Sequence, residues 1–171
     1  MKVFEDVITN DELFSDAYPV KLVDDIAYEV DCKMVQIKEG VDVDIGANPS
    51  TEGDADDQYD ADDTVTTVNN IAHSFRLQAT SFDKSSYKVY IKDYMKQIQK
   101  HLEQTNPERV TAFQKGAAAV VKKVLTNFKD YEFYTGSSMN PDGMVALLNY
   151  REDGITPYFT FFKDGLKEVK C

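Results

Sequence analysis

Five lysines recur at every fourth position in the middle of the chain, and they are the clearest chemical pattern in the sequence. They are Lys84, Lys88, Lys92, Lys96 and Lys100. On a helix each four-residue step overshoots one turn by ~40°, so the five ammonium groups would form a slowly winding ridge. Such a ridge suits the docking of an acidic protein partner, for example the acidic tails of tubulin. The alternative is an ordinary solvated helix face.

A block of carboxylates precedes these lysines in the sequence. Residues 39–63 contain ten acidic residues and no basic one, whereas residues 80–129 contain four acidic and ten basic residues. The acidic block has few large apolar side chains and cannot bury enough surface to offset the entropy of ordering it, so we predict a flexible loop. The opposite charges of the two segments favour electrostatic steering of charged partners.

The acidic block also supplies candidate calcium ligands, because a hard cation prefers several oxygen ligands. They are Asp54, Asp56, Asp57 and Asp60. The spacing of an EF-hand calcium loop is not matched, because Gln58 stands at the fifth position and the Gly and Glu of the sixth and twelfth positions are missing. Without that rigid framework we expect weak binding, in the range of roughly 10⁻⁴ to 10⁻³ M. A solvated linker that adds solubility is the alternative.

Nucleophiles and metal-binding side chains are sparse. The chain has two histidines, His73 and His101, and two cysteines, Cys32 and Cys171, with no pair at zinc-ligand spacing. Phosphate-binding, nucleophile-elbow and metalloprotease motifs are absent. Cys171 is the terminal residue, too mobile for a catalytic nucleophile; it would either cross-link two chains under oxidation or remain an inert thiol. We therefore expect a protein that is not an enzyme and has no tightly bound cofactor.

Size and composition indicate one soluble domain spanning residues 1–171. The net charge is −11, which argues against a general nucleic-acid binder because such proteins present a basic surface. The longest purely apolar stretches have five residues, too few for a membrane-spanning helix, and no secretory signal follows the first Met. We expect a cytoplasmic protein that does not insert into membranes.

The hydrophobic pattern changes period along the chain. Alternation predicts strands over 3–8, 24–38 and 64–77, the last containing His73, and a hairpin of 144–150 with 155–162 around a turn that ends in Gly154. Helical spacing predicts helices over roughly 82–104 and 107–129, the first with a hydroxyl cap in 80–83 and the second capped by Asn106. The apolar positions of the first helix are Tyr87, Ile91, Tyr94, Met95, Ile98 and Leu102, and those of the second are Val110, Phe113, Ala117, Val120, Val121, Val124, Leu125 and Phe128. A short connection makes the helices an antiparallel hairpin, and the fold class is α+β.

Several long motifs carry a family resemblance. Residues 45–53 (IGANPSTEG) and 128–136 (FKDYEFYTG) resemble the two signatures of the translationally controlled tumour protein family, and 139–154 and 156–166 are similar to its animal and fungal members almost letter for letter. The likeness covers the whole chain. It implies a β-tent core of mostly antiparallel sheet, a protruding helical hairpin within residues 80–129 and a long flexible loop.

The resemblance also implies functions. Members are cytosolic, cytoskeleton-associated proteins that bind calcium, tubulin and microtubules, and translation elongation factors; they are linked to protein synthesis and growth and protect against apoptosis. Their core is similar to a chaperone of small GTPases, and exchange activity toward a Ras-type GTPase has been proposed for them. Our leading hypothesis is a non-enzymatic protein with several partners, and regulation of a Ras-type GTPase is the alternative.

Three positions acquire a role through this resemblance. Glu12 matches the acidic position implicated in the GTPase contact, although a carboxylate capping the turn after the first strand is an equal alternative. Cys171 matches the cysteine through which animal members form disulfide dimers, so we expect a monomer that can be linked into a dimer. Ser137 follows Gly136 where the family usually has Glu, which weakens any contact that needs a carboxylate there.

Overall fold

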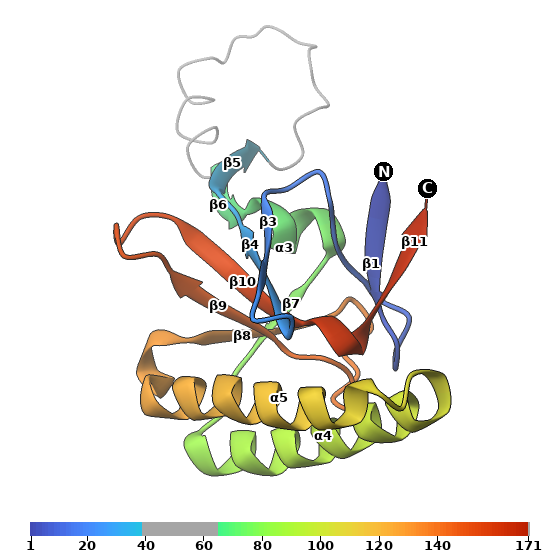
Figure 1. Ribbon diagram of the computed structural model, residues 1–171. Helices are drawn as coiled ribbons and strands as arrows, with labels where there is room; N and C mark the ends of the chain where they lie inside the picture. The colour runs from blue at the N-terminus through green and yellow to red at the C-terminus, as the bar shows by residue number, and fades with distance from the viewer. Residues whose placement is uncertain (39–64, 171) are drawn as a thin grey trace, which may run out of the picture.

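The computed structural model describes residues 1–38 and 65–170, whose strands form three antiparallel sheets (Figure 1). The six-stranded sheet has the order β3-β4-β10-β9-β8-β7, the three-stranded sheet the order β11-β1-β2, and β5 pairs with β6. The strands are β1 (Lys2–Asp6), β2 (Glu12–Ser15), β3 (Val20–Val23), β4 (Ala27–Asp31), β5 (Met34–Lys38), β6 (Val65–Asn69), β7 (Gln78–Thr80), β8 (Glu132–Thr135), β9 (Ala146–Tyr150), β10 (Pro157–Phe162) and β11 (Leu166–Lys170). Together with the helices below, this arrangement confirms the predicted α+β class.

Aromatic side chains join the three-stranded sheet to the six-stranded sheet. Phe14 stacks on Phe4 of its own sheet and on Phe161 of β10, with ring centroids 4.5 Å apart in each pair. Tyr28 of β4 packs at an angle against both Phe4 and Phe14. Because alternate residues of a strand point to opposite faces, the neighbours of Tyr28 and Phe161 in sequence point to the other face, which the helices cover.

Helices α4 (Lys84–Thr105) and α5 (Arg109–Thr126) lie side by side along that other face of the six-stranded sheet (Figure 1). They stand in sequence between β7 and β8, which pair with each other. The buried side chains recur at intervals of three, four or seven residues and are Tyr87, Ile91, Tyr94, Ile98 and Leu102 on α4 and Phe113, Ala117 and Val124 on α5. This recurrence is the signal that predicted the helical pair, whose existence is confirmed.

Both predicted helix caps are wrong. α4 begins after Asp83, whose carboxylate accepts a hydrogen bond from the Ser86 N–H at 2.7 Å, whereas Thr80 is the last residue of β7. Asn106 ends α4 instead of starting α5, because its own N–H donates to the Leu102 carbonyl at 2.7 Å. Thr80 and Asn106 each belong to the end of the preceding element, β7 and α4 respectively, and a cap pattern in the sequence does not show this.

Two predicted strands are wrong in part. Residues 24–38 contain β4 and β5, which belong to different sheets because the pairing breaks at Cys32 and Lys33. In 64–77 the strand ends at Asn69, whose side chain accepts hydrogen bonds from two backbone N–H groups and starts helix α3 (Asn70–Phe75). Asn is a strong helix cap, and it overrides the β-branched residues before it. His73 therefore lies in a helix rather than in a strand.

The C-terminal hairpin follows the prediction. β9 and β10 pair from Tyr150 opposite Pro157, and Gly154 in the turn has a φ of +70°. The hairpin places β10 between β4 and β9 at the centre of the six-stranded sheet. Two short 3₁₀ turns, η1 (Phe128–Asp130) and η2 (Lys163–Gly165), lead into β8 and β11. In the part of the chain described here, no helix is both long and apolar enough to cross a bilayer.

Candidate interaction surfaces

The five predicted lysines all lie on α4 and are exposed, away from the side chains that this helix buries. Within residues 1–38 and 65–170 none of them forms an ion pair with a carboxylate. The ridge winds around the helix, so Lys84 and Lys88 lie beside α5 and line a groove there, whereas the other three are outside its lining. The structure therefore divides the ridge into two parts.

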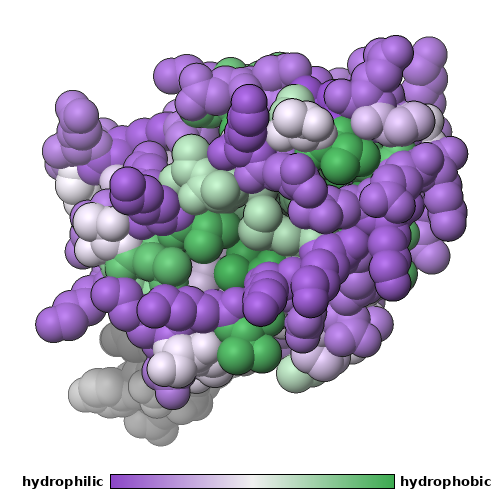
Figure 2. Space-filling view, turned by 60° about the horizontal axis from the view of Figure 1, so that its bottom comes forward, coloured by the Kyte–Doolittle hydropathy of each residue, from purple (hydrophilic) through white to green (hydrophobic). Residues whose placement is uncertain are grey.

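The groove between α4 and α5 has a volume of about 490 Å³. Its apolar lining consists of Met95 from α4 and of Ala118, Val121 and Leu125 from α5, and its cationic residues are Lys84, Lys88 and Lys122. Figure 2 shows this side of the molecule, where hydrophobic side chains gather between hydrophilic ones. The arrangement offers an apolar contact surrounded by positive charge.

Sequence reasoning missed Lys122 and did not predict that its apolar neighbours also border a groove. Val121 and Leu125 were assigned to the core face of α5; they pack against the core but are only partly buried, and they also line the groove. The signal was present: the eight apolar positions predicted for this helix are too many for one face, so some had to border the second side of the helix. The same holds for Met95 on α4, which is also partly buried.

Glu12 begins β2 on another side of the molecule. It is exposed and lies opposite Glu5 in the β1–β2 pairing. Its side-chain carboxylate forms no hydrogen bond or ion pair with the described residues. The turn before it is held instead by Asp6, which accepts from the Ile8 N–H at 2.8 Å, and by Thr9, which accepts from the Asp11 N–H at 3.1 Å. Glu12 is therefore not the residue that caps this turn.

Asp11 links the turn before β2 to the segment after β8. Its carboxylate accepts from the Ser138 hydroxyl at 2.6 Å and from the Ser138 N–H at 3.3 Å, and the Ser137 hydroxyl lies 3.5 Å away. Gly136 is required by this contact, because a side chain there would collide with Asp11. A glutamate in place of Ser137 would bring a second carboxylate to Asp11, so the serine suits this arrangement.

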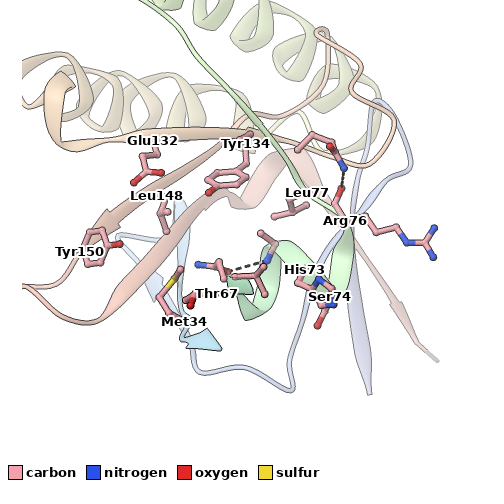
Figure 3. A pocket seen from close by; sticks show the side chains of 15 residues that line it. Met34, Thr67, His73, Ser74, Arg76, Leu77, Glu132, Tyr134, Leu148 and Tyr150 are labelled. Atoms are coloured by element: carbon pink, nitrogen blue, oxygen red, sulfur yellow. Dashed lines mark hydrogen bonds between the residues drawn. The ribbon is translucent and has the colours of Figure 1, made fainter. Parts of the chain in front are cut away.

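A wide cleft of about 850 Å³ opens where β5, β6 and α3 face the strands β7 to β9 (Figure 3). Met34 and Tyr150 are exposed at its walls, and Arg76, Glu132 and His73 are its ionisable side chains apart from tyrosines. Cys32 is not part of the lining. The cleft therefore has the shape of a binding surface but brings no cysteine to its histidine.

Cys32 itself is in an unreactive setting. Its thiol is buried, donates to the Pro157 carbonyl at 3.3 Å and accepts from the Asn69 amide at 3.0 Å. Burial raises the pKa of this thiol from 9.0 to about 11, which leaves little of the nucleophilic thiolate at neutral pH.

Among the described residues no group of three or more His, Cys, Asp or Glu is placed to hold a metal ion. Asp54, Asp56, Asp57, Asp60 and Cys171 lie outside the described residues.

An arginine joins the start of α5 to the turn between β3 and β4 and to η2, at the edge of the sheets. Arg109 binds the Asp164 carboxylate at 2.7 and 3.0 Å, the Asp25 carboxylate at 2.8 Å and the Asp25 carbonyl at 2.8 Å. The hydrogen bond that Arg109 donates to Asp164 raises the pKa of Arg109, and Lys163 and Arg109 together lower the pKa of Asp25. This network fixes how α5 crosses the sheet, and so it positions the residues of both faces of the helix.

Comparisons with known proteins agree with the resemblance seen in the motifs. A family model described as "Translationally controlled tumour protein" matches residues 1–167. Curated relatives named "Translationally-controlled tumor protein homolog" from Yarrowia lipolytica and Schizosaccharomyces pombe are each 61% identical over 170 residues, which is 99% of this chain and 99% of theirs.

Solved structures match along the whole chain as well. The translationally controlled tumor-associated protein p23fyp from Schizosaccharomyces pombe has 60% sequence identity and a TM-score of 0.84, with 100% of both chains covered. The NMR structure of the translationally-controlled tumor protein from Caenorhabditis elegans has 36% identity and a TM-score of 0.73, covering 100% of this chain and 99% of that one. At these identities the likeness extends beyond the fold.

Proposed function

Because the chain belongs to the translationally controlled tumour protein family, we propose that it is a non-enzymatic interaction protein that binds acidic segments of other proteins in the α4–α5 groove. The observation that carries this proposal is the position of Lys84, Lys88 and Lys122 around an apolar groove, without carboxylate partners among the described residues. Cations left free in this way attract carboxylates from solution, and the apolar lining gives the bound segment a second contact.

The acidic tails of tubulin are the first partner that we propose for this groove, and a translation elongation factor is the second. Binding to tubulin would stabilise microtubules and place the protein at the cytoskeleton of the cytoplasm, and the proposed links to protein synthesis, growth and protection against apoptosis would act through similar contacts. The mechanism needs no bond chemistry, because the attraction between opposite charges guides the encounter and burial of apolar side chains prolongs the complex.

Co-sedimentation with microtubules tests this proposal. Charge reversal of the groove pair, Lys84→Glu with Lys88→Glu, should weaken binding about tenfold or more. The matched control is Lys92→Glu with Lys96→Glu, which removes the same charge from the ridge outside the groove and should cost only about twofold to threefold through long-range attraction. Equal losses would assign binding to net charge instead of the groove, and unchanged pelleting of both variants would refute the proposal.

Weak calcium binding is a separate part of the proposal. The candidate ligands are Asp54, Asp56, Asp57 and Asp60, supported by the chemistry of clustered carboxylates and by the family resemblance. An NMR titration with calcium should give fast-exchange shifts at these residues, with an affinity of roughly 10⁻⁴ to 10⁻³ M. Replacing all four by Asn should abolish the shifts, and shifts that persist in this variant would exclude these ligands.

Nucleotide exchange on a Ras-type GTPase is the second candidate function, favoured by the exposed and unengaged carboxylate of Glu12. A free carboxylate can compete for the magnesium or phosphate contacts that hold the nucleotide. Stopped-flow release of a fluorescent guanine nucleotide should be accelerated by the wild type and not by Glu12→Val. The matched control is Glu152→Val, which removes an exposed carboxylate from the turn between β9 and β10 and should retain the acceleration. Release at the spontaneous rate with the wild type would exclude this function.

A further inference from the structure

A second cavity, of about 390 Å³, lies on the other side of α5, between this helix and the six-stranded sheet. Its floor contains Glu29 of β4, Thr160 of β10 and Leu147 of β9, which are direct cross-strand neighbours because Thr160 pairs with both of the others. The residues of α5 that line it recur at intervals of three and four along the helix. They include Gly116, Ala119, Val120, Lys123 and Val124. The cavity is thus built from regular elements.

Small side chains explain why the space is open. At Gly116 the helix touches the turn between β3 and β4 so closely that an added Cβ would lie 2.7 Å from the Ile26 side chain. Further along α5 the facing residues are Ala119 on the helix and Ala27 on the sheet, which cannot fill the separation. Elsewhere α5 is held against the sheet by large rings, such as Phe113 and Phe162 with centroids 6.3 Å apart. The helix therefore bridges a gap that its own side chains leave unfilled.

Two lysines border the cavity, about 12 Å apart along the helix axis. Lys115 adjoins Gly116 at the end of the cavity where Asp24 also lines the wall. Lys123 stands two helical turns further on, and no carboxylate of the described residues forms an ion pair with it. The carboxylate of Glu29 on the floor is bound by Arg151, so its charge is compensated within the protein.

From this combination we infer that the cavity binds a small amphipathic carboxylate, with its apolar body against Ala27, Val120 and Val124 and its anionic head at Lys123. A volume of 390 Å³ is near the lower end of the range for small-molecule sites, about 300–1,000 Å³, which limits the ligand to one ring system or an alkyl chain of about ten carbons. An apolar enclosure whose rim carries lysines without an ion pair among the described residues, Lys123 and Lys115, is complementary to a ligand of this class.

The inference is independent of the proposed function, because the two sites use different faces of α5. Ala119 and Lys123 line this cavity, whereas Ala118 and Lys122 line the α4–α5 groove. All four residues are exposed, so substitutions there can be made without opening the core. Ala119 and Lys123 of the cavity therefore each have a neighbour in sequence that serves as a matched control.

Two-dimensional NMR of the full chain, titrated with sodium decanoate below its micelle concentration, tests the inference. We expect saturable shifts at Ala27, Leu147, Val120 and Val124. Decanol, which lacks the charge, should bind at least about tenfold more weakly, and decyltrimethylammonium should produce no saturable shift. Saturable binding of the cationic probe, or decanoate shifts that do not saturate, would overturn the assignment.

Four variants complete the test. Ala119→Phe, which fills the cavity, and Lys123→Glu, which reverses the charge at its rim, should each weaken decanoate binding about tenfold or more. Ala118→Phe and Lys122→Glu should leave it unchanged within about twofold. If the spectrum of Ala119→Phe shows a disturbed fold, Lys123→Glu decides alone. Equal effects of the cavity variants and their controls would refute the site even if decanoate binds.

Discussion

Lys122 and Lys123 are consecutive on α5, yet they border different cavities: Lys122 lines the groove against α4, and Lys123 lines the cavity against the sheet. Successive residues of a helix are rotated by about 100° around its axis. Neighbouring side chains on the exposed surface of α5 therefore point toward α4 on one side and toward the six-stranded sheet on the other. A single charge reversal at each position should separate binding in the groove from binding in the cavity.

The apolar lining of the groove should contribute to affinity separately from its charge. We expect Val121→Ser to weaken binding of an acidic partner about threefold to tenfold, because it removes apolar contact from the interface. The salt dependence of binding should keep its slope in this variant, whereas Lys122→Glu should flatten it, because only the lysine acts through screened Coulomb attraction. Binding measured at several salt concentrations checks this, and a flattened slope for Val121→Ser would contradict the division of roles.

The Arg109 network should be a substantial contribution to stability. Asp164, one of its partners, has a side chain only 6% exposed, so Arg109→Ala would leave a nearly buried carboxylate without its cation. We expect a loss of about 2–3 kcal/mol in the free energy of unfolding, measured by urea denaturation. Lys2→Ala, which breaks a pair whose two side chains are each 48% exposed, should cost less than about 0.5 kcal/mol. Similar losses in the two variants would refute the structural importance of the network.

The close approach of Gly136 to Asp11 should make this glycine intolerant of substitution. We expect Gly136→Ala to lower the free energy of unfolding by about 1–3 kcal/mol, because the added methyl group meets the Asp11 side chain. Asp11→Gly should cost stability by itself, since the hydrogen bonds to Ser138 are lost. The double variant should then be more stable than the sum of the two changes predicts, and strict additivity in the urea experiment would show that the two residues do not collide.

The buried thiol of Cys32 should react slowly and mainly at high pH. With a pKa of about 11 against 9.0 for an ordinary thiol, only about one molecule in a hundred carries the thiolate at pH 9. In a Cys171→Ser background, alkylation by iodoacetamide should therefore be at least about fiftyfold slower than for the unfolded chain at pH 9, where half of the unfolded thiols are ionised.

The same shift predicts how Cys32 affects stability as the pH changes. Because the folded-state pKa is raised, the folded protein favours the protonated thiol, and this contribution is complete below pH 9 and is lost as the pH rises from 9 to about 11. The stability of wild type relative to Cys32→Ala should fall across that interval, in urea denaturations at each pH. A constant difference would contradict the assigned pKa.

Local pattern determined much of the structure from the sequence alone. The helical pair follows from apolar residues at every third and fourth position, such as Tyr87, Ile91 and Tyr94, because a helix that packs on a sheet must bury one continuous side. The β9–β10 hairpin follows from two apolar strands around a turn that ends in Gly154. The exposure of the lysine ridge follows from the same periodicity.

Only the tertiary structure decided which residues meet across distant parts of the chain. The separation of β4 from β5 and the position of Lys122 depend on pairings and contacts between segments far apart in sequence, which a local pattern does not encode. The two cavities beside α5 depend further on how closely the helix approaches the sheet. That distance is set by Gly116 against Ile26 and by Arg109 against Asp164, since a helix can come no closer to a sheet than its bulkiest contacts allow.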